Sequence, residues 1–366
     1  MSAGRPYETP RFSKRRVDTA GDRIGTPQQT PEDLEVLENW RAAHANILNT
    51  FKTLLYNRAH RFNVQIAQRL KRRPTIIDKL TREPNMHLSR MHDIAGCRVI
   101  FTDLTELNEF RGEMHAARFD HKRRGVEDDR WNYIARPKES GYRGIHDVYT
   151  YHVEPKKGRA AEKQPWNGML VEIQYRTKIQ HAWATAVELA GLVTENNPKF
   201  NRGSEDFIEF FKLSSEVLAR AFEGSLSCAP QLSNEALIEG FYEYNGRTHL
   251  LELFSQLKRT DGGIDLTSSS ILIFHYPVDW TDEGRLEVRS FDSVNAAIQE
   301  YSRLEQEFSD RADVVLVGSR SGESIKSAYR NYFSDAEEFL SFLNEGLEIL
   351  ESSLFFPDPE DELVDD

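Results

Sequence analysis

The first strongly patterned part of the chain has apolar residues that recur about every 3.6 positions, which predicts one long amphipathic helix. The apolar positions are Leu34, Leu37, Trp40, Ala43, Ile47, Phe51, Leu54 and Leu55. Thr30 can cap this helix, Pro31 suits its first position, and Asp33 lies where the acid of a capping box stands. Residues 1–29 mix Arg, Pro, Gly, Thr and Gln without any period, so we predict a disordered tail there.

The remaining pattern alternates between helices and strands, which predicts an α/β (α+β) fold. The expected strands are 97–101, 147–153, 169–175, 271–276, 286–291 and 314–318. The expected helices are a short one opened by Pro74-Thr75, then 104–117, 177–192, 205–221, 235–256, 294–308 and 335–350. The hydrophilic stretch 154–167 suits a hairpin loop.

The length of 366 residues favours two domains, because single cores rarely grow beyond about 250–300 residues. A break over 224–233 separates an expected domain at 30–225 from a smaller α/β domain at 234–352, with an acidic tail at 353–366. We therefore expect a chain ending near Ser225 to fold by itself. The role of the smaller domain stays open between regulation, self-association, binding of a protein partner and neutralisation of a toxin.

The composition excludes several classes of protein. No run of 18 apolar residues and no apolar leader occurs, so we expect neither a membrane span nor a secretory signal. Two cysteines exclude a disulfide framework and favour a reducing, cytoplasmic location. The net charge of −12 argues against general nucleic-acid binding, but cations crowd the segment 58–90. An acidic chain with one dense basic segment is typical of a protein that binds a small polyanion.

Two clusters of charged residues suit a bound polyphosphate. Arg69, Lys71, Lys79 and Arg82 bracket the helix start at Thr75, whose free N–H groups and flanking cations favour phosphate; a solvated basic face is the alternative. Asp93 follows as a carboxylate just before a strand that contains Arg98, and hard oxygen ligands of this kind suit Mg²⁺. A turn or cap role for Asp93 is equally compatible with the pattern.

Two further clusters suit an acceptor pocket. Lys138, Tyr142 and His146 surround Gly141, which permits a tight turn that brings an aromatic ring to the surface; a Tyr that only covers the core is the alternative. Glu172, Gln174 and Arg176 share one face of a predicted strand by its period of two. Burying such a face is costly unless it forms a site, although a wet edge strand remains the alternative.

The order and spacing of these four clusters resemble the synthetase domain of the RelA/SpoT family, which makes (p)ppGpp, over roughly residues 31–200. The resemblance implies a nucleotidyltransferase-like mixed sheet flanked by helices, Mg²⁺ as cofactor, ATP as donor and GTP or GDP as acceptor. It implies that Asp93 and Glu172 bind the metal and that Glu172 also activates the acceptor 3′-hydroxyl.

The resemblance assigns the other residues to two nucleotides. ATP would be held by Arg69 and Arg98 at the adenine and by Lys71, Thr75, Lys79 and Arg82 at the phosphates. The acceptor would be held by Lys138, Tyr142, His146, Gln174 and Arg176. Only about 30 residues precede the first helix, so we expect no alarmone hydrolase domain.

The sequence departs from the family at the acceptor side. Trp131 and Asn132 stand where many members carry a Lys and an acidic residue, and Gly144 replaces a common Ser. Other acceptors, the 3′ end of tRNA or adenine nucleotides, therefore stay open, as does a nucleotide sensor without activity. Retention of both Asp93 and Glu172 speaks against the sensor.

Overall fold

The computed structural model describes residues 7–154, 164–194, 204–225, 228–260, 269–275, 285–291, 296, 300, 303–304, 307, 312–318 and 322–355. The contacts divide the chain into two compact units. The first comprises Met1–Tyr133 and Gly144–Lys178, and the second comprises Ile134–Arg143 and Ile179–Asp366. This division falls elsewhere than the boundary near 225 expected from the sequence, and each unit is described by itself below.

The first unit is built on a mixed five-stranded sheet in the order β1-β2-β5-β4-β3. The strands are β1 Gln65–Leu70, β2 Ala95–Phe101, β3 Lys122–Arg123, β4 Ile145–Thr150 and β5 Leu170–Thr177. The central pair, β2 and β5, is parallel, while the remaining neighbours pair antiparallel. The predicted mixed sheet is confirmed, although β1 and β3 were not expected. β1 escaped prediction because it is an edge strand whose residues are largely exposed and polar.

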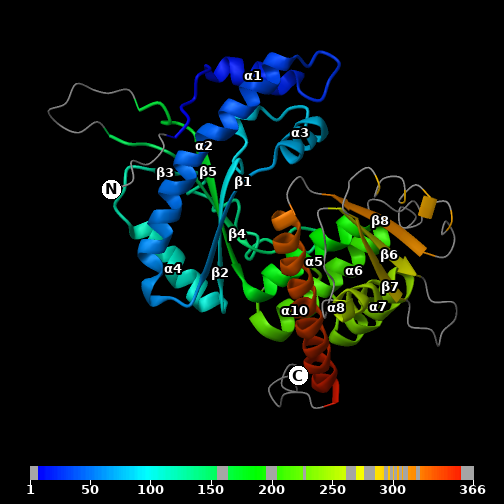
Figure 1. Ribbon diagram of the computed structural model, residues 1–366. Helices are drawn as coiled ribbons and strands as arrows, with labels where there is room; N and C mark the ends of the chain where they lie inside the picture. Colours follow the sequence, from blue (N-terminus) through cyan, green and yellow to red (C-terminus); the bar gives the residue numbers. More distant parts are fainter. Residues whose placement is uncertain are drawn as a thin grey trace. The chain divides into compact units, whose positions relative to one another are not determined.

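Two helices, α2 (Pro31–Arg58) and α4 (Leu104–Ala116), cover one face of this sheet (Figure 1). The ring of Phe51 in α2 lies 5.4 Å from that of Tyr149 in β4. The ring of Phe110 in α4 lies 6.4 Å from that of Tyr175 in β5. These aromatic contacts close the core on this side, so the opposite face of the sheet is left for polar side chains.

The start of α2 is the capping box that the sequence predicts. The Asp33 backbone N–H donates to the Thr30 hydroxyl at 3.3 Å, and the Thr30 N–H donates to the Asp33 carboxylate at 3.1 Å. The two interactions satisfy backbone donors that the helix itself leaves unpaired. Local sequence is sufficient here because all the partners lie within four residues.

The predicted disorder of the N-terminal tail is wrong for residues 7–29, which contain the helix α1 (Lys14–Arg23). Val17, Ala20 and Ile24 are buried, and α1 packs against α2 and the short helix η2 (Leu88–Arg90). The segment lacks enough apolar residues to order itself, so its order comes from tertiary contacts that no local period reveals.

α2 also contains a fully buried histidine, His44, whose Nδ1 lies 2.7 Å from the Trp40 carbonyl oxygen. Burial lowers the pKa of His44 to about 4, and the bond to Trp40 opposes this shift only in part. The ring is therefore neutral in the folded protein at neutral pH. In the unfolded chain a histidine has a pKa of about 6.5.

This difference predicts a pH-dependent loss of stability. Between pH 6.5 and pH 4 the unfolded chain binds the extra proton, so the free energy of unfolding should fall as pH falls, by about 3 kcal/mol at pH 4. Urea unfolding of the wild type and of His44→Phe, at pH 7.5 and pH 4, measures this contribution as the difference between the two pH slopes. Equal slopes in both proteins would contradict a neutral buried His44.

The second unit is mainly helical and includes a small antiparallel sheet in the order β7-β6-β8. Its helices are α5 Lys178–Thr194, α6 Ser204–Leu218, η4 Ala219–Glu223, α7 Asn234–Thr248, α8 Leu250–Thr260 and α10 Gly322–Phe355. Its strands are β6 Ser269–His275, β7 Arg285–Phe291 and β8 Ala312–Gly318. The single helix predicted over 235–256 is two helices, because His249 adopts a left-handed backbone with φ of 52° between them.

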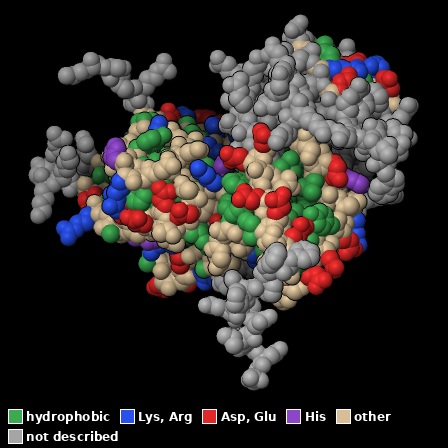
Figure 2. Space-filling view, turned by 90° about the horizontal axis from the view of Figure 1, so that it is seen from below, with side chains coloured by type: hydrophobic (Ala, Val, Ile, Leu, Met, Phe, Trp, Pro, Cys, Tyr) green, Lys and Arg blue, Asp and Glu red, His purple; other side chains and the backbone are tan. Residues whose placement is uncertain are grey.

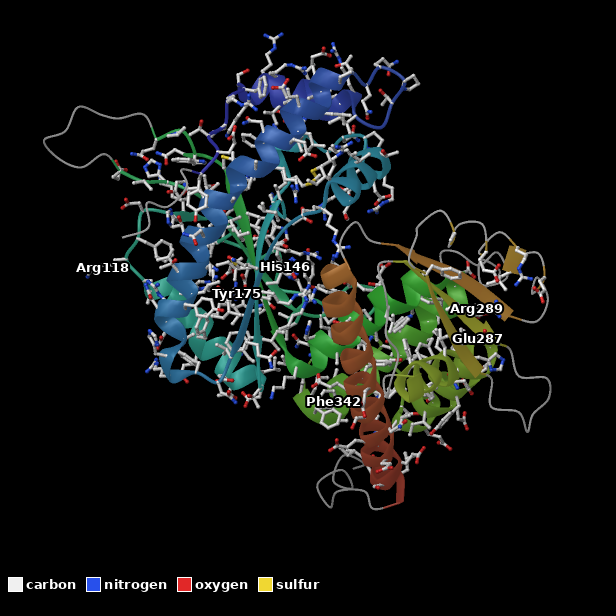
Figure 3. All side chains as sticks on the ribbon, viewed as in Figure 1. Arg118, His146, Tyr175, Glu287, Arg289 and Phe342 are labelled. Carbon is white, nitrogen blue, oxygen red and sulfur yellow. The ribbon has the colours of Figure 1, made fainter. Side chains whose placement is uncertain are left out.

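One continuous core joins the helices of the second unit across the expected boundary. Phe210 and Phe211 of α6 contact Phe241 of α7 and Phe339 of α10, all of them buried. Phe342 of α10, labelled in Figure 3, also lies against Phe222 of η4. The helices before and after residue 225 therefore bury each other's apolar surface.

Several predictions fall on residues that the structure does not describe. These are most of the hairpin loop 154–167, most of the helix 294–308 and the tail from 356 onward. Among the described residues, no helix is long and apolar enough to cross a membrane. On the face of the molecule seen in Figure 2, acidic side chains recur over much of the surface, in keeping with the net charge of −12.

Candidate active site

The face of the first sheet opposite α2 and α4 carries a row of polar side chains. Glu172 on β5 is paired with Gly96 on β2, and Gln174 is paired with both Arg98 on β2 and His146 on β4. Paired residues on neighbouring strands point to the same face, as do residues two apart on one strand. The predicted alignment of Glu172 and Gln174 is thus confirmed, and the pairing of strands adds Arg98 and His146 to it.

Glu172 is buried and fully engaged by its neighbours. Its Oε1 lies 3.0 Å from His146 Nδ1, and its Oε2 accepts a hydrogen bond of 2.7 Å from the Gln174 amide. Burial by itself would raise the pKa of Glu172, but the bond and charge of His146, with Gln174 and Lys79, outweigh it and hold the pKa at about 2. Glu172 is therefore an anion at neutral pH. His146 is labelled on the sheet in Figure 3.

Asp93 lies in the turn immediately before β2 and is flanked by two lysines. Its Oδ2 is 2.8 Å from Lys71 Nζ and its Oδ1 is 3.4 Å from Lys79 Nζ. Lys71 is held in place by its backbone, whose N–H donates to Ile94 and whose carbonyl accepts from Arg41 Nε. Lys79 comes from α3 (Arg73–Arg82), the predicted short helix. Lys71, which follows β1, and Lys79 of α3 thus both lie against the Asp93 carboxylate.

The other predicted ATP-binding residues lie on the same strands and helix. Arg69 on β1 is paired with Gly96, and Arg98 is paired with Ala67, so the two arginines are diagonal neighbours on one face. Thr75 is exposed in the first turn of α3. Arg82, at the end of α3, donates to Asp78 at 3.0 Å. The structure therefore brings Arg69 near Arg98, while Arg82 forms a local ion pair.

The sequence pattern did not single out His92, which neighbours Asp93 in the turn. Burial lowers the pKa of His92, assisted by the charges of Arg124 and Lys79, while Glu172 and Asp93 oppose the shift. Its ring meets that of Trp131 edge-on at 5.2 Å. The charges of both carboxylates, Asp93 and Glu172, therefore act on the His92 ring. Sequence periodicity could not reveal this, because the position of His92 depends on how the turn before β2 folds.

The predicted acceptor loop, Lys138 to Tyr142, forms a tight turn in the second unit. The Gly141 N–H donates to the Lys138 carbonyl at 2.8 Å, and the Lys138 N–H donates to the Tyr142 carbonyl at 3.2 Å. Gly141 has φ of 86°, and a Cβ there would lie 3.0 Å from backbone of Lys212 and from Ser215 Cβ. The predicted need for glycine is confirmed, for both its conformation and the close approach of α6.

The aromatic ring of this loop, Tyr142, lies near a lysine and a second aromatic ring. Lys138 Nζ lies 5.2 Å from the centroid of the Tyr142 ring, and the Trp183 ring lies 6.3 Å away. The next residue, Arg143, is buried and ion-paired with Glu223 of η4. The loop is therefore fixed to the helices of the second unit, and Tyr142 is a partly buried ring rather than a fully exposed one.

The predicted acceptor residues are thus distributed over both units. Lys138 and Tyr142 belong to the second unit, while His146, Gln174 and Arg176 belong to the sheet of the first. Arg176 shares the face of Glu172 and is buried.

The donor set suits a magnesium ion that arrives with a nucleotide. Among the residues that the structure describes, no group of three or more His, Cys, Asp or Glu side chains could hold a metal by itself. Mg²⁺ commonly uses only one or two carboxylates, with substrate phosphates and water completing its shell. Asp93 and Glu172 are hard oxygen donors, and Lys79 both contacts Asp93 and lowers the pKa of Glu172 by its charge, so the chemistry of these residues fits such an ion.

A mixed five-stranded sheet flanked by helices, with carboxylates and cations beside its polar face, defines an α/β (α+β) protein. Residues 68–190 match the family described as "Region found in RelA / SpoT proteins". The chain therefore contains a RelA/SpoT region, as the order of its motifs indicated.

The chain is similar to the GTP pyrophosphokinase YjbM of Bacillus subtilis (strain 168), with 37% identity over 122 residues. The match covers 33% of this chain and 52% of that protein, so the chain spans about half the length of this relative. Among solved structures, the small alarmone synthetase 2 from Bacillus subtilis gives a TM-score of 0.38 at 22% identity over 52% of this chain and 94% of that one. The small alarmone synthetase 1 from the same organism, bound to its product pppGpp, gives 0.37 at 26% identity over 52% and 93%.

Proposed function

We propose that the chain is a pyrophosphokinase that transfers the β,γ-diphosphate of ATP to the 3′-hydroxyl of GTP or GDP. The observation that carries this proposal is the pair of carboxylates within a RelA/SpoT region, with Asp93 against Lys71 and Lys79 and Glu172 against His146. The relative named GTP pyrophosphokinase supports the guanine acceptor. We expect the reaction to take place in the cytosol, where both nucleotides are available.

On the donor side, we propose that ATP lies along β1, β2 and α3. Arg69 and Arg98, as diagonal neighbours, would enclose the adenine between planar guanidinium groups, which stack well on aromatic rings. Lys71 and Lys79 would leave Asp93 for the phosphates, with Thr75 at the helix start and Arg82 beside them. Charge-assisted contacts of this type are worth about 1.5–3 kcal/mol each.

In the proposed transfer, the acceptor 3′-oxygen bonds to the β-phosphorus of ATP and its hydroxyl proton is released to water. The bond from that phosphorus to the oxygen bridging to the α-phosphorus breaks, and AMP leaves with that oxygen and the bonding electron pair. Bound Mg²⁺, held by Asp93 and Glu172, would neutralise charge on the phosphates. Glu172, ionised at neutral pH with a pKa of about 2, would also accept the hydrogen bond of the 3′-hydroxyl and orient it.

On the acceptor side, we propose that Tyr142 stacks on the base and that Lys138 and His146 contact phosphate or ribose. Gln174 and Arg176 would shape the pocket beside Glu172. Stacking tolerates any base, so Tyr142 would add affinity without choosing guanine.

Trp131 gives a reason to test a second acceptor. Where many family members carry a lysine, this chain has an aromatic ring that packs against His92. Loss of a cation removes a contact to an acceptor phosphate, which is a smaller handicap for the 3′ end of tRNA than for a free triphosphate. Adenine nucleotides are the remaining candidates.

Labelled ATP offered in parallel with GTP, GDP, ATP and bulk tRNA tests the acceptor. We expect labelled phosphate on GTP or GDP, with AMP formed in equal amount. Tyr142→Ala should raise the acceptor KM about 10- to 100-fold, as expected for loss of one stacked base, whereas Tyr142→Phe should be mild. Label on tRNA alone would replace the guanine nucleotide as acceptor but would leave the donor assignments intact.

A further inference from the structure

Residues 8–29, here called the N-terminal strap, run along the first unit and touch several of its elements. At one end, the Trp166 indole N–H donates to the Glu8 carbonyl at 3.1 Å. Asn39, a buried residue of α2, accepts from the Arg11 N–H at 2.9 Å and donates to the Thr9 carbonyl at 3.0 Å. The strap is thus anchored on α2 and on the turn before β5.

Further along, α1 of the strap contacts η2 through a carboxylate and a close approach. Asp18 accepts two hydrogen bonds from Ser89, one from its backbone N–H at 2.9 Å and one from its hydroxyl at 3.0 Å. At Gly21, an added Cβ would lie only 2.7 Å from Leu88 Cβ, so the helix and η2 touch without space for a side chain. Leu88 is fully buried, which makes this contact a fixed one.

The end of the strap also lies against α3, through a second close approach at a glycine. Gly25 has φ of 79°, and a Cβ there would lie 2.3 Å from Thr81 Oγ1, near the end of α3. The preceding residue, Ile24, is buried. The strap therefore touches η2 and α3 within eight residues of its own sequence, between Asp18 and Gly25.

η2 and α3 lie close in sequence to the two partners of the Lys79–Asp93 ion pair in the proposed site. Asp93 lies four residues after Ser89, and Lys79 lies two residues before Thr81. The pairing of Lys71 with Asp93 is set by the β1–β2 ladder, which ends at Leu70 and Ala95. Among the described residues, no strand ladder joins α3 to the Asp93 turn, so the 3.4 Å contact of Lys79 with Asp93 depends on how α3 and η2 are held together.

We propose that the N-terminal strap is a brace for the phosphate and metal site, with Asp18 as the positioning residue that sets the Asp93 turn against Lys79. The inference rests on the proposed function of that site and adds residues that lie outside the RelA/SpoT match, which begins at residue 68. Displacement of a reacting group by about 1 Å can reduce a rate about 100-fold, so a brace of this kind has a measurable effect.

The test compares Asp18→Ala with two matched variants of the full chain. Asp18→Ala removes both bonds to Ser89. Asp18→Asn keeps an oxygen for the Ser89 N–H, and its amide can donate to the Ser89 hydroxyl, so it should restore function. Asp22→Ala removes the same charge one turn later on α1, where Asp22 is exposed and 3.6 Å from His87.

The first readout is binding of Mg²⁺ with α,β-methylene-ATP, in which the bond that transfer would break is replaced. We expect Asp18→Ala to weaken this binding and to lower kcat, each about 10- to 100-fold, with the acceptor KM unchanged. Asp18→Asn and Asp22→Ala should remain within about twofold of the wild type. Circular dichroism and Tm establish that every variant is folded.

The outcomes separate this inference from the proposed function. Wild-type binding and kcat in folded Asp18→Ala, or an equal loss in Asp22→Ala, would overturn the brace. A wild-type protein that bound the analogue but transferred phosphate to no acceptor would overturn the proposed function, while loss of that binding in Asp18→Ala alone would still support the brace.

Discussion

Asp93→Asn and Glu172→Gln are each expected to reduce pyrophosphate transfer at least about 100-fold, because a metal held against a polyphosphate contributes several kcal/mol to the transition state. Each change keeps the size of the side chain and removes its charge. In the Asp93→Asn variant the neutral amide would no longer hold Lys71 and Lys79 by charge, so the lysines would remain near the phosphates while the ligand for the metal is lost.

The Glu172→Gln variant tests a second feature of the site. His146 and Gln174 both contact the Glu172 carboxylate, and with Lys79 they hold it ionised. The isosteric amide keeps the shape of this group but cannot act as an anionic ligand. We therefore expect the Mg²⁺ concentration for half-maximal binding of α,β-methylene-ATP to rise in both variants.

The measurements are the initial rate with labelled ATP, the Mg²⁺ dependence of analogue binding, and Tm. Glu83→Gln is the matched control, because Glu83 is exposed directly after α3 and its loss removes the same charge. A rate of one tenth of the wild type in either site variant, with the fold retained, would contradict the metal-binding assignment.

A chain that ends at Ser225 is expected to lose the folded second unit, contrary to what the break at 224–233 suggested. Phe210 and Phe211 would lose their contacts with Phe241 and Phe339. Removing a buried aromatic side chain costs about 3–5 kcal/mol, and a domain is stable by only about 5–15 kcal/mol. The free energy lost with several such contacts therefore exceeds the stability that would keep α5 and α6 folded.

The truncation should also affect the acceptor loop. Ser215 of α6 donates to the Gly141 carbonyl at 2.6 Å, and Arg143 is ion-paired with Glu223, so the loop depends on the same helices. We expect aggregation, or loss of the dispersed amide signals of α5 and α6 in a ¹H–¹⁵N spectrum. Removal of residues 356–366 is the control and should leave the fold intact. A soluble, cooperatively unfolding chain ending at Ser225 would contradict this expectation.

Several local features of the fold and the candidate site could be predicted from the sequence, each for a physical reason. The alternation of β5 places Glu172 and Gln174 on one face because side chains of a strand alternate. Thr30 and Asp33 mark the start of α2 because a capping box needs only neighbouring residues. Gly141 marks a turn because its φ of 86° is costly for other residues. The roles of these residues toward ATP and the acceptor remain predictions.

The tertiary structure decided what depends on partners far apart in the chain. The parallel pairing of β2 with β5 brings the Asp93 turn and Glu172 to one sheet, although 79 positions separate them in sequence. α1 packs on η2 and α2 through Asp18, Gly21 and other contacts, so a polar and aperiodic segment forms a helix. Likewise, the loop before Arg143 groups with the second unit because buried ion pairing and packing with α6 and η4 hold it there. Local periodicity reports how a segment can bury its own side chains, whereas these features follow from which distant segment covers it.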